Sequence, residues 1–328
     1  MRTLFEQFHK FTRLAARQRK EYPEEIQLEV TNACNLSCAM CPHTFGDIPQ
    51  EHFSFNLFTQ LVDRNPAPKR LVLTGWGEPL MHPQFFSMIE HANKQWPTTQ
   101  IRFTTNGILL DAKMRETMAR HAIDRIAVSI DLWPDREVRP ELQRFLHPSS
   151  PKTTRNLTEY YADTKLSEQT PLALQTLVLE DNMQDIHQLL AFAGEQGIPE
   201  MNLVRLQPYP GLPIERPTWE TEQALIREIK KWGREAQVRV RSLNQQSMFI
   251  RFATGFDRIC LKTDDSLYIL LDGTVTPCCN LRNYMIGKMD VGRYSISDMW
   301  QSQKEKEFFA QQNTICGRCD ALFHQYRK

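Results

Sequence analysis

The chain has 328 residues, of which 41% are hydrophobic and 24% charged, and its formal net charge is +1. This is ordinary globular composition, which excludes disorder and allows one large core with a smaller appended unit. The small net charge gives no global field that favours nucleic acid or an acidic membrane, so neither is an expected partner. No apolar run reaches the roughly eighteen residues of a bilayer span, and the N-terminus lacks a secretory signal, which predicts a cytoplasmic protein.

The first segment, residues 2–20, is predicted to form an amphipathic helix. Leu4, Phe8 and Phe11 follow helical spacing, and basic residues gather toward the end of the segment. Such a helix either meets a membrane or partner, or packs on the main domain with its cations near the negative end of the helix dipole. We favour the packed helix.

Three cysteines follow the first apolar run at the spacing C-x3-C-x2-C: Cys34, Cys38 and Cys41. Three thiolates on one short loop can hold three irons of a [4Fe-4S] cluster, and the fourth iron then stays open for chemistry. Two alternatives use the same residues, namely a zinc loop with His43 as fourth ligand, or three buried thiols. The eight cysteines of the chain favour metal or redox chemistry over a disulfide framework.

Six apolar runs alternate with helical patterns between residues 25 and 208. The predicted strands are 26–30, 70–74, 100–104, 125–130, 172–179 and 201–206. The predicted helices between them are 54–62, 83–94, 111–121, 152–164 and 183–196. Six β-α repeats predict a parallel sheet with right-handed crossovers, either as an open sheet or as a partial barrel.

Polar residues follow these strands, and active-site residues gather at the carboxyl ends of parallel strands. Gly77-Glu78-Pro79 follows the second strand, and Thr105-Asn106 follows the third. By itself each of these motifs is equally an ordinary turn. Ser129 and Asp131 end the fourth strand, where alternation places their side chains on the same face.

Two further polar residues lie on the last two strands. Gln175 either meets a ligand with its amide or faces a neighbouring helix loop. Arg205 ends the sixth strand, where it either neutralises a ligand carboxylate, as a candidate catalytic residue, or pairs with a structural acid.

The remaining cysteines fall in the last seventy residues and predict a second metal site. They are Cys260, Cys278, Cys279, Cys316 and Cys319. Between them, residues 267–277 predict a β-hairpin, because Asp272-Gly273 between β-rich runs favours a tight turn. Four cysteines with one C-x2-C pair also suit a zinc ribbon.

The cysteine loop and the Gly77-Glu78-Pro79 turn resemble two motifs of the radical S-adenosylmethionine (radical SAM) superfamily, C-x3-C-x-φ-C and G-G-E-P. Met40 stands where an aromatic residue is commoner, and Trp76 interrupts the usual glycines. Thr105-Asn106-Gly107 resembles the family's T-N-G. The resemblance implies a partial (β/α)6 barrel of the TIM type, with a [4Fe-4S] cluster on the first three cysteines. It also implies that S-adenosylmethionine is bound by Gly77, Glu78, Pro79, Thr105, Asn106, Ser129 and Asp131, and Gln175 is a further candidate from its place on the fifth strand.

The C-terminal part resembles the small auxiliary-cluster extension of radical SAM enzymes, the twitch form within the SPASM group. The resemblance implies one auxiliary [4Fe-4S] cluster with the ligands Cys260, Cys278, Cys316 and Cys319. The spacing in related aminocyclitol dehydrogenases favours Cys278 over Cys279 as the ligand. Cys279 is then a spare thiol or, as a candidate catalytic residue, a hydrogen-atom donor.

These inferences divide the chain into an N-terminal helix (1–22), a radical SAM core (23–215), a helical linker (216–255) and the auxiliary-cluster domain (256–328). The resemblance implies an enzyme that cleaves S-adenosylmethionine to a 5′-deoxyadenosyl radical and then oxidises, by dehydrogenation or cross-linking, a small molecule or a peptide. A low-potential donor such as flavodoxin or ferredoxin would supply electrons. The alternatives are a redox-neutral epimerase that uses Cys279, and a non-enzymatic iron-sulfur electron carrier.

Overall fold

The computed structural model describes residues 12, 20–38, 40–45, 48–133, 150–206, 217–242, 260–289 and 295–316. The predicted N-terminal helix lies outside these residues except for Thr12 and Lys20, and Cys319 also lies outside them. None of the helices in the described ranges is long and apolar enough to cross a membrane.

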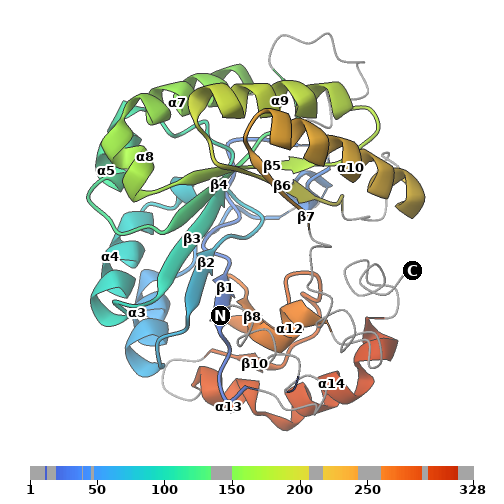
Figure 1. Cartoon of the computed structure of the whole chain (residues 1–328). Helices are drawn as coiled ribbons and strands as arrows, with labels where there is room; N and C mark the ends of the chain where they lie inside the picture. The colour runs from blue at the N-terminus through green and yellow to red at the C-terminus, as the bar shows by residue number, and fades with distance from the viewer. Residues whose placement is uncertain are drawn as a thin grey trace.

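A parallel sheet lies at the centre of the described structure, with its helices on the outer side (Figure 1). In the described residues seven strands run parallel in chain order. They are β1 (Glu25–Leu28), β2 (Arg70–Leu73), β3 (Gln100–Thr105), β4 (Arg125–Ser129), β5 (Leu172–Leu177), β6 (Glu200–Val204) and β7 (Arg239–Ser242).

Alternation along the strands separates the two faces of this sheet. In β2, Leu71 and Leu73 are fully buried, whereas Arg70 and Val72 between them are partly exposed. The buried face packs against the helices and forms the core, and the other face lines the inner side of the curved sheet. The covering helices are α3 (Phe55–Arg64), α4 (Phe85–Gln95), α5 (Ala112–Met118), α7 (Ser150–Ala162), α8 (Thr164–Gln169), α9 (Met183–Gln196) and α10 (Trp219–Glu235).

All six strands predicted from the sequence are present, and the predicted partial (β/α)6 barrel is confirmed as the fold class. Strand β7 was not predicted. It lies within the range assigned to a helical linker, after α10, and continues the sheet beside β6 with Glu200 opposite Arg239. Its sequence Arg-Val-Arg-Ser has one apolar residue, too few to give a strand signal.

The C-terminal unit extends the same sheet instead of standing apart from it. Strand β8 (Ser266–Ile269) pairs with β1 in parallel, and the predicted hairpin is confirmed by its antiparallel pairing with β9 (Thr274–Thr276). Gly273 in the turn has φ +80°, a conformation that favours glycine. The other elements of this unit are α12 (Leu261–Asp265), β10 (Gly287–Lys288), α13 (Ile296–Trp300) and α14 (Gln303–Ile315).

Polar contacts fix this unit to the barrel at two further points. The indole Nε1 of Trp300 donates to the carbonyl of Lys20 (2.8 Å), just before β1. At the start of α13, the backbone nitrogen of Ile296 donates to Oδ1 of Asn65 (2.6 Å), the residue that ends α3. The C-terminal unit is therefore built into the edge of the barrel at β1.

Candidate active site

A cavity of about 400 Å³ opens at the carboxyl ends of strands β1 to β6. It brings together residues predicted separately along 170 residues of sequence: Cys34, Cys38, Cys41, Gly77, Glu78, Thr105, Asn106, Ser129, Asp131, Gln175 and Arg205. Pro79, also predicted, begins the short helix η1 (Pro79–Met81) and is buried.

The three cysteines of the first motif are partly exposed on one wall of this cavity. The backbone nitrogen of Cys41 donates to the carbonyl of Cys38 (2.9 Å), which closes the loop before the short helix α2 (Pro42–Phe45). Burial raises the pKa of all three thiols, to about 12 for Cys38, so a metal must displace their protons.

The donor set fits an iron-sulfur cluster better than a single ion. Within the described ranges, no three Cys, His, Asp or Glu side chains converge as ligands of one metal ion. A [4Fe-4S] cluster instead distributes its thiolate ligands over separate irons, and three thiols facing one cavity suit it. His43, the alternative fourth ligand for zinc, lies on α2, and its buried Nε2 has no hydrogen-bond partner among the described residues.

Gly77 lets the second motif approach the cysteine loop. Its backbone nitrogen donates to the carbonyl of Thr31 (3.1 Å), and the nitrogen of Glu78 donates to that of Ala33 (2.8 Å). A Cβ at Gly77 would lie 2.5 Å from both carbonyl oxygens. Only glycine therefore fits between the two backbone segments.

Glu78 is 2% exposed and braces the site. Its Oε1 accepts from Thr105 Oγ1 (2.7 Å) and from the nitrogen of Leu80 (3.2 Å), and its Oε2 accepts from the nitrogen of Asn106 (2.7 Å). Burial raises the pKa of Glu78 to about 7, although these three donors favour the carboxylate. Most of its accepting capacity thus joins the end of β3 to η1, and one lone pair of Oε2 remains for a ligand.

Asn106 connects the third strand end to the cysteine loop. Its Nδ2 donates to Oδ1 of Asn35 (2.7 Å), and its Oδ1 accepts from the nitrogen of Ile108 (3.1 Å). Asn35 lies between the first two cysteines of the motif. The side chain that resembles the family's T-N-G therefore holds the loop in place.

Asp131 is 5% exposed and lines the cavity beyond β4. Its Oδ1 accepts from the nitrogen of Leu177 (2.8 Å), and burial raises its pKa to about 6. Ser129 and Gln175 are direct partners in the β4–β5 register, so both reach the same part of the cavity. Together they offer hydroxyl, amide and carboxylate groups to a polar ligand.

Arg205 forms an ion pair with Glu222 of α10, which is 3% exposed. This contact agrees with the second of the two roles expected for Arg205, an ion pair with a structural acid. Arg205 also lines the cavity, and its role toward a ligand stays a prediction.

The C-terminal cysteines lie in different surroundings. Cys260, Cys278 and Cys316 are 6%, 7% and 3% exposed. Gln312 joins two of them, since its Oε1 accepts from the nitrogen of Cys260 (3.3 Å) and its carbonyl accepts from that of Cys316 (2.7 Å). Phe308 packs with the same pair of cysteines. These thiols are enclosed by protein.

The neighbouring residues Cys278 and Cys279 differ in burial and in the groups around them. Burial raises the pKa of Cys278 to about 12, and the adjacent Cys279 and, to a smaller extent, Cys260 raise it further. Cys279 is partly exposed, and the Nζ of Lys262 lies 3.4 Å from its sulfur. This geometry favours Cys278 as the ligand, and the choice stays a prediction.

Several residues that contact the second motif from behind the cavity lining were not predicted from the sequence. The main ones are Glu29 at the end of β1, its ion-pair partner Arg282, and Trp76 in the second motif. Glu29 had a visible signal, because it is a charged residue inside the apolar run of the first strand. Arg282 had none, because it lies 253 residues away.

Comparison with known protein families shows the superfamily to which the chain belongs. A model described as the Radical SAM superfamily matches residues 28–193, half of the chain, so the protein belongs to this superfamily. A second model, SPASM, described as an iron-sulfur cluster-binding domain, matches residues 260–320 and includes all five C-terminal cysteines. The predicted cofactors are confirmed at this level: a [4Fe-4S] cluster with S-adenosylmethionine, and auxiliary iron-sulfur binding.

Among individual proteins, the chain is similar to the tungsten-containing aldehyde ferredoxin oxidoreductase cofactor-modifying protein of Pyrococcus furiosus. The two are 22% identical over an alignment of 318 positions, which covers 90% of this chain and 85% of that protein. It also resembles the GTP 3′,8-cyclase of Clostridium perfringens, at 26% identity over 195 residues. That match spans only 56% of this chain and 55% of the cyclase.

Solved structures share the fold. SuiB of Streptococcus suis, bound to S-adenosylmethionine, aligns with a TM-score of 0.69 at 14% identity, over 92% of this chain and 72% of SuiB. The enzyme anSMEcpe with bound AdoMet aligns with a TM-score of 0.66 at 16% identity, over 90% of this chain and 86% of that one. At such identities the likeness concerns the architecture alone.

Proposed function

We propose that the protein is a radical SAM oxidase that removes a hydrogen atom from a small molecule or peptide and passes the substrate electron to one auxiliary cluster. The observation that carries the proposal is the cavity itself, which gathers three cysteines, the Gly77–Glu78 turn and the polar ends of strands β3 to β6. The C-terminal unit contributes a second group of cysteines, of which Cys260, Cys278 and Cys316 are buried.

In this proposal Cys34, Cys38 and Cys41 hold the first cluster. When bound, the cluster and S-adenosylmethionine supply a 5′-deoxyadenosyl radical. The protein itself binds S-adenosylmethionine and orients it. Its free Glu78 lone pair suits an ammonium, and the carboxylate of Asp131 suits hydroxyl groups.

Apolar side chains at the cavity keep water from reactive groups. Leu132, Leu179 and Leu206 form a small buried cluster, with Met40 and Leu177 packed against it. Met40, Leu177 and Leu206 also line the cavity. Because Met is adaptable, Met40 fills the place of the commoner aromatic residue with little loss of apolar contact.

The enclosed thiols of Cys260, Cys278 and Cys316, with Cys319, would hold the auxiliary cluster. A fully ligated cluster has no open iron, so its role is electron transfer. Oxidation needs this role, because a substrate that loses a hydrogen atom must then lose an electron. A low-potential donor such as flavodoxin or ferredoxin starts the cycle.

A peptide or a small molecule remains the proposed substrate class. Some structures with the shared fold hold peptides, for example SuiB bound to the precursor peptide SuiA. The similar protein of Pyrococcus furiosus is named as a cofactor-modifying protein. These names support a maturation reaction in general and do not separate a peptide from a cofactor.

A redox-neutral epimerase is the second candidate, and the position of Cys279 favours it. Its thiol is partly exposed while its neighbour is buried, so it is open to partners from solvent. An epimerase would use such a thiol to return a hydrogen atom.

Anaerobic reconstitution followed by reduction tests the enzyme class. We expect release of 5′-deoxyadenosine from S-adenosylmethionine, measured by chromatography, with no release before reconstitution. A reconstituted and reduced protein that makes none would reject both enzyme candidates and leave the electron carrier. Substrate turnover in deuterated water then separates the two enzymes, since an epimerase incorporates solvent deuterium at carbon and an oxidase does not.

A further inference from the structure

Glu29 lies at the end of β1 and is fully buried. A buried carboxylate is costly unless it is paired and hydrogen-bonded. Its partner is Arg282 of the C-terminal unit, whose Nη1 donates to Oε1 (2.9 Å) and Nη2 to Oε2 (2.8 Å). This bidentate pair joins the first strand of the barrel to the extension.

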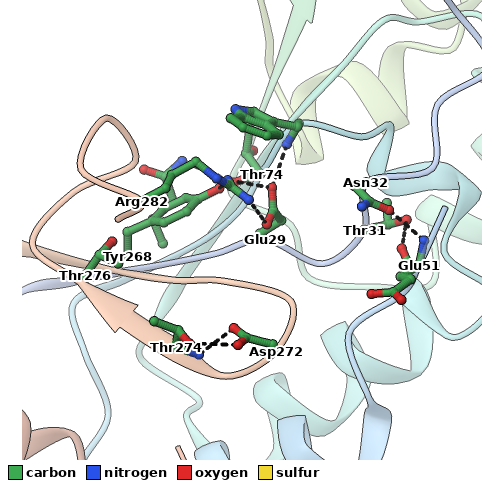
Figure 2. Close-up of polar contacts among 12 residues, drawn as sticks. Glu29, Thr31, Asn32, Glu51, Thr74, Tyr268, Asp272, Thr274, Thr276 and Arg282 are labelled. Carbon is green, nitrogen blue, oxygen red and sulfur yellow. Dashed lines mark hydrogen bonds and ion pairs between the residues drawn. The ribbon is translucent and has the colours of Figure 1, made fainter. Parts of the chain in front are cut away.

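The same guanidinium has two further contacts. Its central carbon lies 3.7 Å from the centroid of the Trp76 ring, a close cation–π contact, and its Nη1 donates to the hydroxyl of Tyr268 (3.2 Å). Figure 2 shows Arg282 reaching Glu29 beside Tyr268. Trp76 is the residue that departs from the glycines of the family motif, and here its ring has a defined partner.

Glu29 also holds the backbone of the second motif. Its Oε1 accepts from the backbone nitrogen of Trp76 (3.2 Å). A Cβ at Gly75 would lie 2.3 Å from Cγ of Glu29, so the carboxylate side chain packs tightly under the turn. The next residues, Gly77 and Glu78, line the cavity. The position of Glu29 therefore sets where the cavity-lining turn begins.

Arg282 lies on the loop that also carries Cys278. The nitrogen of Leu281 donates to the carbonyl of Cys278 (3.1 Å), and that of Tyr284 donates to the carbonyl of Leu281 (2.9 Å). A short series of contacts thus leads from the loop of the second cysteine set, through Arg282 and Glu29, to the Trp76 turn.

We propose that Arg282 is a positioning residue through which the C-terminal unit sets the affinity of the cavity for S-adenosylmethionine. The inference rests on the proposed function in one respect, that this cavity binds S-adenosylmethionine. The bidentate pair and the stacked ring hold the turn in its binding geometry before the ligand arrives, so the ligand does not have to order it. Because such coupling is reciprocal, bound S-adenosylmethionine also protects the Arg282 loop from amide hydrogen exchange.

The test uses Arg282→Lys in the full-length, reconstituted protein. Lysine keeps a charge for Glu29, so the carboxylate stays paired and the chain folds, but it loses the second hydrogen bond and the planar contact with Trp76. We expect the dissociation constant for S-adenosylmethionine to rise about tenfold, the usual effect of losing one charge-assisted hydrogen bond. Amide hydrogen exchange in a peptide that spans residues 74–80 should accelerate by a similar factor.

Two variants of the same unit serve as controls. Lys288→Met removes an exposed ion pair with Asp272 (2.9 Å), and Trp300→Phe removes the partly buried hydrogen bond to Lys20. Neither residue contacts Glu29 in the interactions described. Both variants should bind S-adenosylmethionine within twofold of wild type, even where Trp300→Phe lowers the melting temperature.

The outcomes separate this inference from the proposed function. Wild-type protein that binds no S-adenosylmethionine contradicts the proposed function itself. Wild-type protein that binds, with an Arg282→Lys variant of equal affinity and equal exchange in the turn, overturns the inference alone. Equal weakening in Trp300→Phe also overturns it, because Arg282 would then act only through general stability.

Discussion

The two cysteine sets of this chain lie in opposite surroundings. Those of the first motif are partly exposed on a loop that faces a cavity. In the second set, Cys260, Cys278 and Cys316 are at most 7% exposed, and Cys260 and Cys316 pack with the buried side chain of Phe308. A ligand can bind beside a metal centre on the partly exposed set. A metal centre on the enclosed set has no space for a ligand and can only transfer electrons.

The supports of the two sets differ as well. The first loop is held by hydrogen bonds from the ends of β2 and β3, through Gly77, Glu78 and Asn106, and behind these strands lies the main core. The second set lies at the start of α12, after β9 and at the end of α14, in a unit whose strands have two to four residues. We infer that protein contacts support the first site and that the second site depends on its metal for stability.

Removing the first set is the strongest test of this comparison. The triple variant Cys34→Ala, Cys38→Ala and Cys41→Ala should lose all cleavage of S-adenosylmethionine, because no thiolate remains to hold the first cluster. Its melting temperature should change little, since the loop keeps its backbone hydrogen bonds. Chromatography of 5′-deoxyadenosine and thermal unfolding of the reconstituted protein measure the two effects. Cleavage at the wild-type rate would contradict the assignment of this loop.

The strands of the barrel could be predicted from the sequence, whereas the ion pairs could not. Each strand with one buried face has an apolar residue at every second position, so the six strands and the polar residues at their ends were visible in the sequence. Strand β7 was not, because Val240 is its only apolar residue. The pairs Glu29–Arg282 and Arg205–Glu222 were also invisible, because no local pattern names a partner that only the fold brings near.

The second set should respond in the opposite way to a single change. Cys278→Ala should lose about four irons per chain and several degrees of melting temperature in the reconstituted protein, because a closed cluster contributes folding energy. Cys279→Ala is the matched control, since its sulfur lies beside Lys262 and is partly exposed, and it should keep the full iron content. Iron analysis of both variants decides the ligand. Loss in the Cys279 variant alone would reverse the assignment.

Glu78 tests how far hydrogen bonds alone shape the first site. Glu78→Gln keeps the shape, but its NH₂ group cannot accept, so at least one donor among Thr105, Leu80 and Asn106 loses its acceptor. We expect the dissociation constant for S-adenosylmethionine to rise about tenfold, the size of one charge-assisted hydrogen bond, with iron content near wild type. Titration calorimetry and iron analysis measure this. Unchanged affinity would show that the carboxylate does not shape the ligand site.

The smallest expected effect concerns pH and the buried His82 beside η1, which is 4% exposed. Its Nδ1 accepts from the nitrogen of Gln84 (3.0 Å), so Nε2 carries the proton toward the carbonyl of Phe53 (3.0 Å). Burial lowers the pKa of His82 below 6.5. As the pH falls through 6.5, the unfolded chain therefore takes up a proton before the folded chain does, and stability is lost.

The variant His82→Gln isolates this contribution, because glutamine offers one donor and one acceptor and does not titrate. We expect the unfolding free energy of wild type to fall relative to that of the variant between pH 7 and pH 5, because only the wild-type unfolded chain gains this proton first. Urea unfolding of the metal-free chains measures the difference and leaves out the other histidines, which both proteins share. Parallel stability curves would contradict the prediction, because they would show that His82 has the same pKa in the folded and the unfolded chain.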